Sequence, residues 1–282
     1  MLRSFFVLGI YLISTHLCGQ GFVQNKGQWE EDFLFKLDIT GGSVFIEDGQ
    51  LTFHMVDRSG FYGVHGTLDS AEVDGIEHHH AFRFRFLGSN ETDQFIPSEP
   101  YTHHVNYFLG NDPSRWRSEI RPSRELSMRE IYNGIDLKLI ESQGNLIYEF
   151  HLAPGAKPSD IRIKMEGIDN LHTDRYGNLV LPTSIAEILE SKPMVYQIKG
   201  DRRWDIPAEF VIAGNTVSYA IESYDTNLSL VIDPELIFST FSGSTTDNWG
   251  YTATPDKDGF AYTGSATYGN GYPTTTGAYD VT

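Results

Sequence analysis

The stretch of residues 137–152, LKLIESQGNLIYEFHL, decides the fold class. From Leu146 to Leu152 every second side chain is apolar, and this period of two is typical of a half-buried β-strand. Residues 142–145 (SQGN) separate this run from a second apolar-rich run, and glycine and asparagine tolerate the positive φ that a tight hairpin requires. The stretch therefore predicts a β-hairpin with one buried face.

The same two signals recur along the chain. Period-two alternation is found again at residues 82–86, 161–166 and 217–221, and turn residues are found at 175–178, 199–201 and 213–215. We find no convincing helical periodicity. Short strands with turn signals at roughly 8–12-residue spacing are typical of a sandwich or barrel. We therefore expect an all-β fold, with an antiparallel β-sandwich-like domain over residues 20–235.

The composition excludes several classes of protein. The chain has 282 residues, with 21 Lys+Arg against 38 Asp+Glu, a formal net charge of −17 and a pI near 4.9. Nucleic acids attract proteins through Lys and Arg, so we expect no nucleic-acid partner. A hydrophobic content of 40% excludes disorder throughout. The single cysteine, Cys18, excludes a disulfide framework and a cysteine-based zinc site.

Residues 1–19 have the pattern of a signal peptide. A short basic start ending at Arg3 is followed by an apolar run over residues 5–13, which is shorter than the roughly 20 residues that span a bilayer. We place cleavage near Gly19. The alternative is a lipidated Cys18, but the residue before a lipidated cysteine is normally small, whereas Leu17 is large. The pattern predicts export to the cell surface or beyond. No later segment is apolar for long enough to predict a transmembrane helix.

The composition changes at about residue 236, beyond which Ser, Thr, Gly, Tyr and Asp dominate. Residues 256–265 read DKDGFAYTGS and residues 272–280 read YPTTTGAYD. This resembles the SBBP repeat, a bacterial β-propeller repeat with the consensus D-x-x-G-N-x-Y-V-T-G followed by F-P-T-T-x-G-A-Y, although Phe260 stands where Asn is usual. The resemblance implies an incomplete first repeat over residues 236–282. Because a propeller has about four to eight blades, we expect the chain to be a truncated part of a longer protein, and the alternative is that this tail packs along the body.

Residues 22–235 resemble the uncharacterised domain that precedes SBBP repeats in large secreted bacterial proteins. The resemblance rests on five motifs, at residues 25–29 (NKGQW), 105–112 (VNYFLGND), 132–137 (YNGIDL), 153–156 (APGA) and 230–234 (LVIDP). It implies a cell-surface protein, often with a carboxyl-terminal type IX secretion or gliding-motility sorting domain. No catalytic activity is attached to that family, so we expect no catalytic and no cofactor-binding residue. Within these motifs we expect Asp136 and Asp233, which lie at strand ends, to have a structural role.

Two sets of residues are candidates for a metal site. On a strand His78 and His80 share a face while His79 points away, and imidazole is a common zinc ligand, but a third ligand has to be guessed. Asp256 and Asp258 with a following glycine resemble part of a calcium loop, yet a β-turn explains the same residues. Polar strand histidines and a turn are the default interpretations.

Two functions from different classes remain. The first is a secreted, non-catalytic module for binding, adhesion or display of a repeat array, whose extracellular ligand is a glycan or a protein. The alternative is a carbohydrate-active enzyme or carbohydrate-binding module, with a carboxylate pair such as Asp136 and Glu149 in a cleft. Aromatic residues that could stack on a sugar are Trp116, Trp204 and Tyr268. No nucleophile elbow, phosphate loop or dinucleotide motif is present.

Overall fold

The computed structural model describes residues 21–57, 76–91 and 94–234 in full, and the backbone of residues 236–238, 248–255 and 261–267. The expected signal peptide and the candidates Cys18, Asp256, Asp258 and Tyr268 lie outside the described residues. The described part is all-β with antiparallel pairing, as the sequence predicts, and contains two short 3-10 turns, η2 (Pro113–Arg115) and η3 (Pro158–Asp160). No helix among the described residues could cross a membrane.

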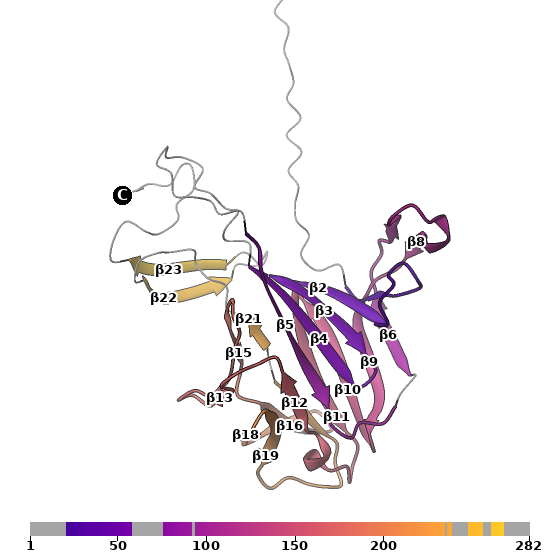
Figure 1. The fold of residues 1–282 in the computed structure, drawn as a ribbon. Helices are drawn as coiled ribbons and strands as arrows, with labels where there is room; N and C mark the ends of the chain where they lie inside the picture. The colour runs from indigo at the N-terminus through magenta and orange to yellow at the C-terminus, as the bar shows by residue number, and fades with distance from the viewer. Residues whose placement is uncertain are drawn as a thin grey trace, which may run out of the picture.

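Two large antiparallel sheets form the body (Figure 1). The first has eight strands, in the order β1 (Val23–Gln24), β2 (Phe35–Ile39), β3 (Gly42–Glu47), β4 (Gln50–Asp57), β5 (His78–Phe86), β12 (Ile163–Glu166), β19 (Thr216–Ile221) and β18 (Ala208–Ala213). The second has seven, in the order β17 (Arg202–Ile206), β16 (Met194–Lys199), β20 (Leu230–Asp233), β11 (Asn145–Leu152), β10 (Ile135–Ser142), β9 (Ser123–Tyr132) and β6 (Phe95–Pro100).

Three smaller sheets complete the described part. One has four strands, in the order β13 (His172–Thr173), β14 (Leu179–Pro182), β15 (Glu187–Glu190) and β21 (Leu236–Phe238). A second pairs β7 (Val105–Tyr107) with β8 (Arg117–Ile120), on an arm that projects beyond the large sheets in Figure 1. The third pairs β22 (Asn248–Pro255) with β23 (Ala261–Thr267).

The hairpin predicted from residues 137–152 is confirmed as β10 and β11. Ser142 pairs with Asn145, so Gln143 and Gly144 form a two-residue turn, and their φ values are +51° and +78°. Positive φ at both central residues is the geometry that matches the twist of the flanking strands. Gln143 is one of five residues other than glycine in the described part that adopt a positive φ.

One hydrophobic core lies between the two large sheets. The predicted alternation places Phe82, Phe84 and Phe86 of β5 in this core. Across it, the ring of Phe84 meets Tyr148 at 6.3 Å and the ring of Phe86 meets Phe150 at 6.1 Å, both edge to face. These contacts join the two sheets, because β5 belongs to the first and β11 to the second. The alternate side chains of each strand, most of them polar, lie on the outer faces of the two sheets.

The region expected to be an incomplete propeller repeat shows no propeller in its described residues. β21 lies just beyond residue 235 and pairs with β15 of the body, with Ile188 opposite Phe238. β22 and β23 form a two-stranded antiparallel sheet. The resemblance of residues 236–282 to the SBBP repeat therefore stays a prediction.

Two glycines with the same backbone conformation provide a test of the packing. Gly167 has a φ of +82°, and a Cβ added there would lie 2.7 Å from the carbonyl oxygen of Ala81, whereas Gly155 has a φ of +84° and open space around it. Gly155→Ala should cost only the left-handed backbone strain of roughly 1–2 kcal/mol. Gly167→Ala should cost roughly 1–3 kcal/mol more, because strand β5 has to shift. Urea denaturation measures both, and equal losses would contradict this packing.

Candidate functional site

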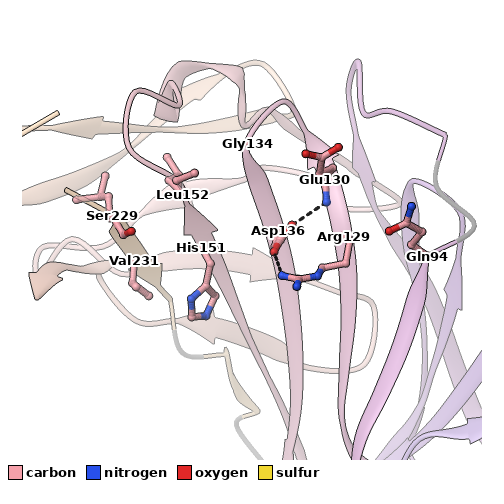
Figure 2. Close-up of a pocket in the computed structure, with 11 residues that line it drawn as sticks. Gln94, Arg129, Glu130, Gly134, Asp136, His151, Leu152, Ser229 and Val231 are labelled. Atoms are coloured by element: carbon pink, nitrogen blue, oxygen red, sulfur yellow. Dashed lines mark hydrogen bonds and ion pairs between the residues drawn. The ribbon is translucent and has the colours of Figure 1, made fainter. Parts of the chain in front are cut away.

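A polar pocket of about 530 Å³ lies on the outer face of the second sheet, where β10 begins (Figure 2). Its lining includes Arg129 of β9, Asp136 of β10 and His151 of β11. In Figure 2 the Asp136 side chain points toward Arg129, and His151 lies on the neighbouring strand. The motif YNGIDL supplies the turn residue Gly134 and the carboxylate of Asp136 to this pocket, whose lining also includes Glu130.

Asp136 stabilises an irregularity in β9. Its carboxylate accepts a hydrogen bond of 2.7 Å from the backbone N–H of Glu130 and forms an ion pair with Arg129. Glu130 has a φ of +49°, at the point where the register between β9 and β10 shifts. A bulge leaves a backbone donor outside the ladder, and the carboxylate satisfies that donor. This arrangement supports the scaffold role that the sequence indicates for Asp136.

The carboxylates of Asp136 and Glu149, the candidate catalytic pair, lie on adjacent strands of the second sheet. Each contacts a basic side chain, however. Asp136 pairs with Arg129, and the Nε2 atom of His151 lies 2.6 Å from the Glu149 carboxylate. Neither aromatic candidate that the structure describes lines this pocket, since Trp204 packs against the core and Trp116 lies on the β7–β8 arm beside Phe108.

The side chain of His80 has a structural role, because it bonds to the backbone of two other segments. Its Nδ1 atom accepts a hydrogen bond of 3.2 Å from the backbone N–H of Ser184, so its proton resides on Nε2, which donates to the carbonyl of Gly167 at 2.9 Å. Both ring nitrogens are thereby engaged by protein groups, while His78 is exposed at the start of β5. Across residues 21–57, 76–91 and 94–234 no cluster of three or more His, Cys, Asp or Glu side chains is arranged to hold a metal ion.

A different pair of histidines, which the sequence does not predict, lies on β4 and β5. The Nε2 atom of His54 lies 3.0 Å from the Nδ1 atom of His79, and the two rings are stacked with centroids 5.1 Å apart. Burial, together with the charge of His79, lowers the pKa of His54. The two residues are 25 positions apart in sequence, and only the pairing of β4 with β5 brings them together.

A second concavity, of about 460 Å³, lies on the outer face of the first sheet, and we call it the Trp29 groove. Its lining joins the loop before β2 to strands β2, β3 and β4, and consists of Trp29, Glu31, Asp32, Phe33, Lys36, Phe45, Glu47 and Thr52. The ring of Phe33 is 5.2 Å from that of Trp29 and 4.9 Å from that of Phe45. The groove thus combines a row of aromatic rings with several carboxylates.

The NKGQW motif builds the loop that carries Trp29. The Asn25 side chain accepts a bond of 3.0 Å from the backbone N–H of Gly27 and donates to the carbonyls of Glu31 and Phe33 at 3.0 and 3.1 Å. Gln28, which is buried, accepts from the backbone N–H of Lys26 at 2.7 Å. Side-chain bonds to the backbone of this kind fix an irregular loop in one conformation.

The VNYFLGND motif meets the NKGQW motif at the base of the β7–β8 arm. The ring of Tyr107 contacts that of Trp29 edge to face at 4.8 Å. From the same arm, the Nε atom of Arg117 donates to the carbonyl of Lys26 at 2.7 Å, and Arg115 forms an ion pair with Glu30. Two motifs that are about 80 positions apart in sequence therefore form a single structure that positions Trp29.

The family model described as "Domain of unknown function (DUF7948)" matches residues 22–235. The chain belongs to this family. The match confirms the prediction that the body is a domain of unknown function, and it ends before the region that resembles the SBBP repeat. No curated protein and no solved structure matches the chain.

The DUF7948 domain of this chain also contains a carboxylate in its core. Glu190 of β15 is 0% exposed, and its Oε1 atom accepts the hydroxyl of Tyr148 at 2.6 Å, while its Oε2 atom has no hydrogen-bond partner among the described residues. Burial raises the pKa of Glu190 to about 7, although the bond from Tyr148 lowers it. In the sequence this residue is indistinguishable from an ordinary polar strand residue.

Glu190 should make the stability of the DUF7948 domain depend on pH. Its pKa is raised from 4.5 to about 7 in the folded state, so between these values the folded protein retains a proton that the unfolded chain has lost. The free energy of unfolding should therefore fall as the pH rises through this window, by about 3 kcal/mol from this group. Urea denaturation from acidic to mildly alkaline pH measures the effect.

The matched variants are Glu190→Gln, which removes the titrating group, and Glu187→Gln, which changes an exposed carboxylate on the same strand. The fall in the free energy of unfolding with rising pH should persist in Glu187→Gln and disappear in Glu190→Gln. Identical pH profiles for these two variants would show that Glu190 does not titrate as described.

Proposed function

We propose that this chain is an exported, non-catalytic binding module that acts at the cell surface. The Trp29 groove is the observation that carries the proposal. Concave sites lined mainly by apolar and aromatic side chains, with a few fixed polar groups, are the usual form of a ligand site. Trp29 and Phe45 are only half-buried although they lie in such a concavity, so their rings are available to a ligand.

The way in which the loop is held supports binding. The side chains of Asn25 and Gln28 and the guanidinium of Arg117 fix its backbone without a ligand. A site that is already ordered loses less conformational entropy when its ligand arrives, so more of the contact energy appears as affinity. Both motifs that build this site belong to the domain of unknown function, over residues 22–235.

The non-catalytic part of the proposal is supported by the acidic residues outside the groove. Asp136 and Glu149, the pair that a carbohydrate-active enzyme could use, are each occupied by a basic neighbour. Glu190 has the raised pKa of a general acid but lies fully inside the core, where no substrate reaches it. The surface location rests on the signal-peptide pattern of residues 1–19, and the display of a repeat array rests on the resemblance of residues 236–282 to the SBBP repeat.

Incubation of the protein with a panel of polysaccharides and immobilised surface proteins tests the proposal. We expect retention on at least one of these without any chemical product, and loss of this retention in Trp29→Leu or Phe45→Leu. Tyr176→Ala is the control, because it removes an exposed ring from the turn between β13 and β14. Release of new reducing ends that depends on Asp136 or Glu149 would instead establish the carbohydrate-active enzyme.

A further inference from the structure

We propose that the Trp29 groove binds a cationic side chain, foremost the guanidinium of an arginine in an extracellular partner protein. This inference rests on the proposed binding function and names the class of its ligand. It follows from three observations on the groove: its rings, the balance of charges in its lining, and the cation that already lies next to Trp29.

The rings form a continuous aromatic wall. Phe33 stands between Trp29 and Phe45, tilted by 44° from the first and by 58° from the second. Each aromatic face carries partial negative charge, and Trp attracts a cation most strongly. An arginine side chain can also stack its planar guanidinium on such a face, which a lysine ammonium cannot do.

The charges of the lining are unbalanced. Among the described residues, three carboxylates (Glu31, Asp32 and Glu47) and one ammonium (Lys36) line the groove. The Nζ atom of Lys36 lies 2.8 Å from the carboxylate of Asp38, which is not part of the lining. The charge of Lys36 is therefore compensated outside the groove, and the lining retains negative charge next to its aromatic rings.

Glu47 is held in place by neutral groups. Its carboxylate accepts a hydrogen bond of 2.8 Å from the hydroxyl of Thr52 and another from the side-chain amide of Gln50. These direct partners are neutral. The Thr52 hydroxyl in turn accepts a hydrogen bond of 3.1 Å from the Nε atom of Arg83, whose guanidinium forms an ion pair with Glu166. A guanidinium that stacks on the aromatic wall can bond to such a fixed carboxylate, and bonds between charged partners are the stronger ones.

A cation of this chain, which is paired with Asp38, already lies near this wall. The Nζ atom of Lys36 lies 5.9 Å from the centre of the Trp29 ring, within the distance for a cation–π interaction. The ring thus presents its face to positive charge, and it does so on a half-buried residue in a concavity. In addition, the net charge of −17 favours the approach of a basic partner.

A neutral sugar fits these observations less well. It would stack on Trp29, but it would bring no positive charge to the three carboxylates of the lining. Desolvating unpaired carboxylates costs free energy, and a cationic ligand offsets that cost. We therefore choose the arginine side chain over the glycan, and a glycan is one outcome of the test.

The test uses the full chain and two small probes. N-acetyl-arginine-amide carries a guanidinium, whereas N-acetyl-citrulline-amide has nearly the same shape but a neutral urea group. Isothermal titration calorimetry should show at least about tenfold tighter binding of the arginine probe. Added salt should weaken the binding of the arginine probe, because exposed charges are screened.

Variants locate the binding. Glu47→Gln and, on the exposed rim, Glu31→Gln should each weaken the arginine probe several-fold, and Trp29→Leu should abolish measurable binding. Glu209→Gln is the matched control, because Glu209 is exposed on β18 at the opposite edge of the first sheet. The unfolding midpoint of each variant shows whether it is folded. If Glu47→Gln does not fold, Glu31→Gln still decides the test.

Equal binding of the two probes, no binding of either, or binding unchanged by Glu31→Gln and Glu47→Gln would overturn the inference. The result for the proposed binding function can be told apart from the result for the cationic ligand. If a polysaccharide is retained through Trp29 while the arginine probe does not bind, the chain is a binding module whose ligand is a glycan, and only the cationic ligand is refuted.

Discussion

The two large sheets are held together by aromatic rings that meet edge to face between β5 and β11. Phe84 and Phe86 reach Tyr148 and Phe150 across the core, at 6.3 and 6.1 Å. Each such pair stabilises the fold by roughly 0.5–1.5 kcal/mol beyond the burial of its area. Because the side chains of a strand alternate, this inner packing also determines which residues are left on the two outer faces, where both concavities lie.

The same packing accommodates the fully buried carboxyl group of Glu190. Glu190 lies against Tyr148, so the ring that joins the sheets also gives the carboxyl its hydrogen bond. In a medium of low polarity the neutral form of an acid is favoured, which is why burial raises the pKa of Glu190 to about 7. Near neutral pH the core therefore contains a group whose charge changes within the physiological range.

Much of the fold could be predicted from local sequence, but little of the site could. The period of two placed Phe82, Phe84 and Phe86 in the core, and the SQGN turn placed the β10–β11 hairpin, because both signals act between near neighbours. The groove depends on contacts between distant segments, such as that of Trp29 with Tyr107. The NKGQW sequence alone does not determine which distant strand the motif contacts. The stacking of His54 on His79 could not be predicted for the same reason.

The two concavities differ in how the acidic residues in and around them are paired. On the second sheet Asp136 pairs with Arg129, Glu149 with His151, and Glu125 with Lys138 at 2.7 Å. Each of these three carboxylates therefore already has a basic partner on the surface. In the Trp29 groove the oriented carboxylate, Glu47, has neutral partners, and the one basic side chain of the lining turns to Asp38. Unbalanced charge beside aromatic rings is a feature that scaffolding alone does not require, and this is why we propose the groove, rather than the more polar pocket, as the binding site.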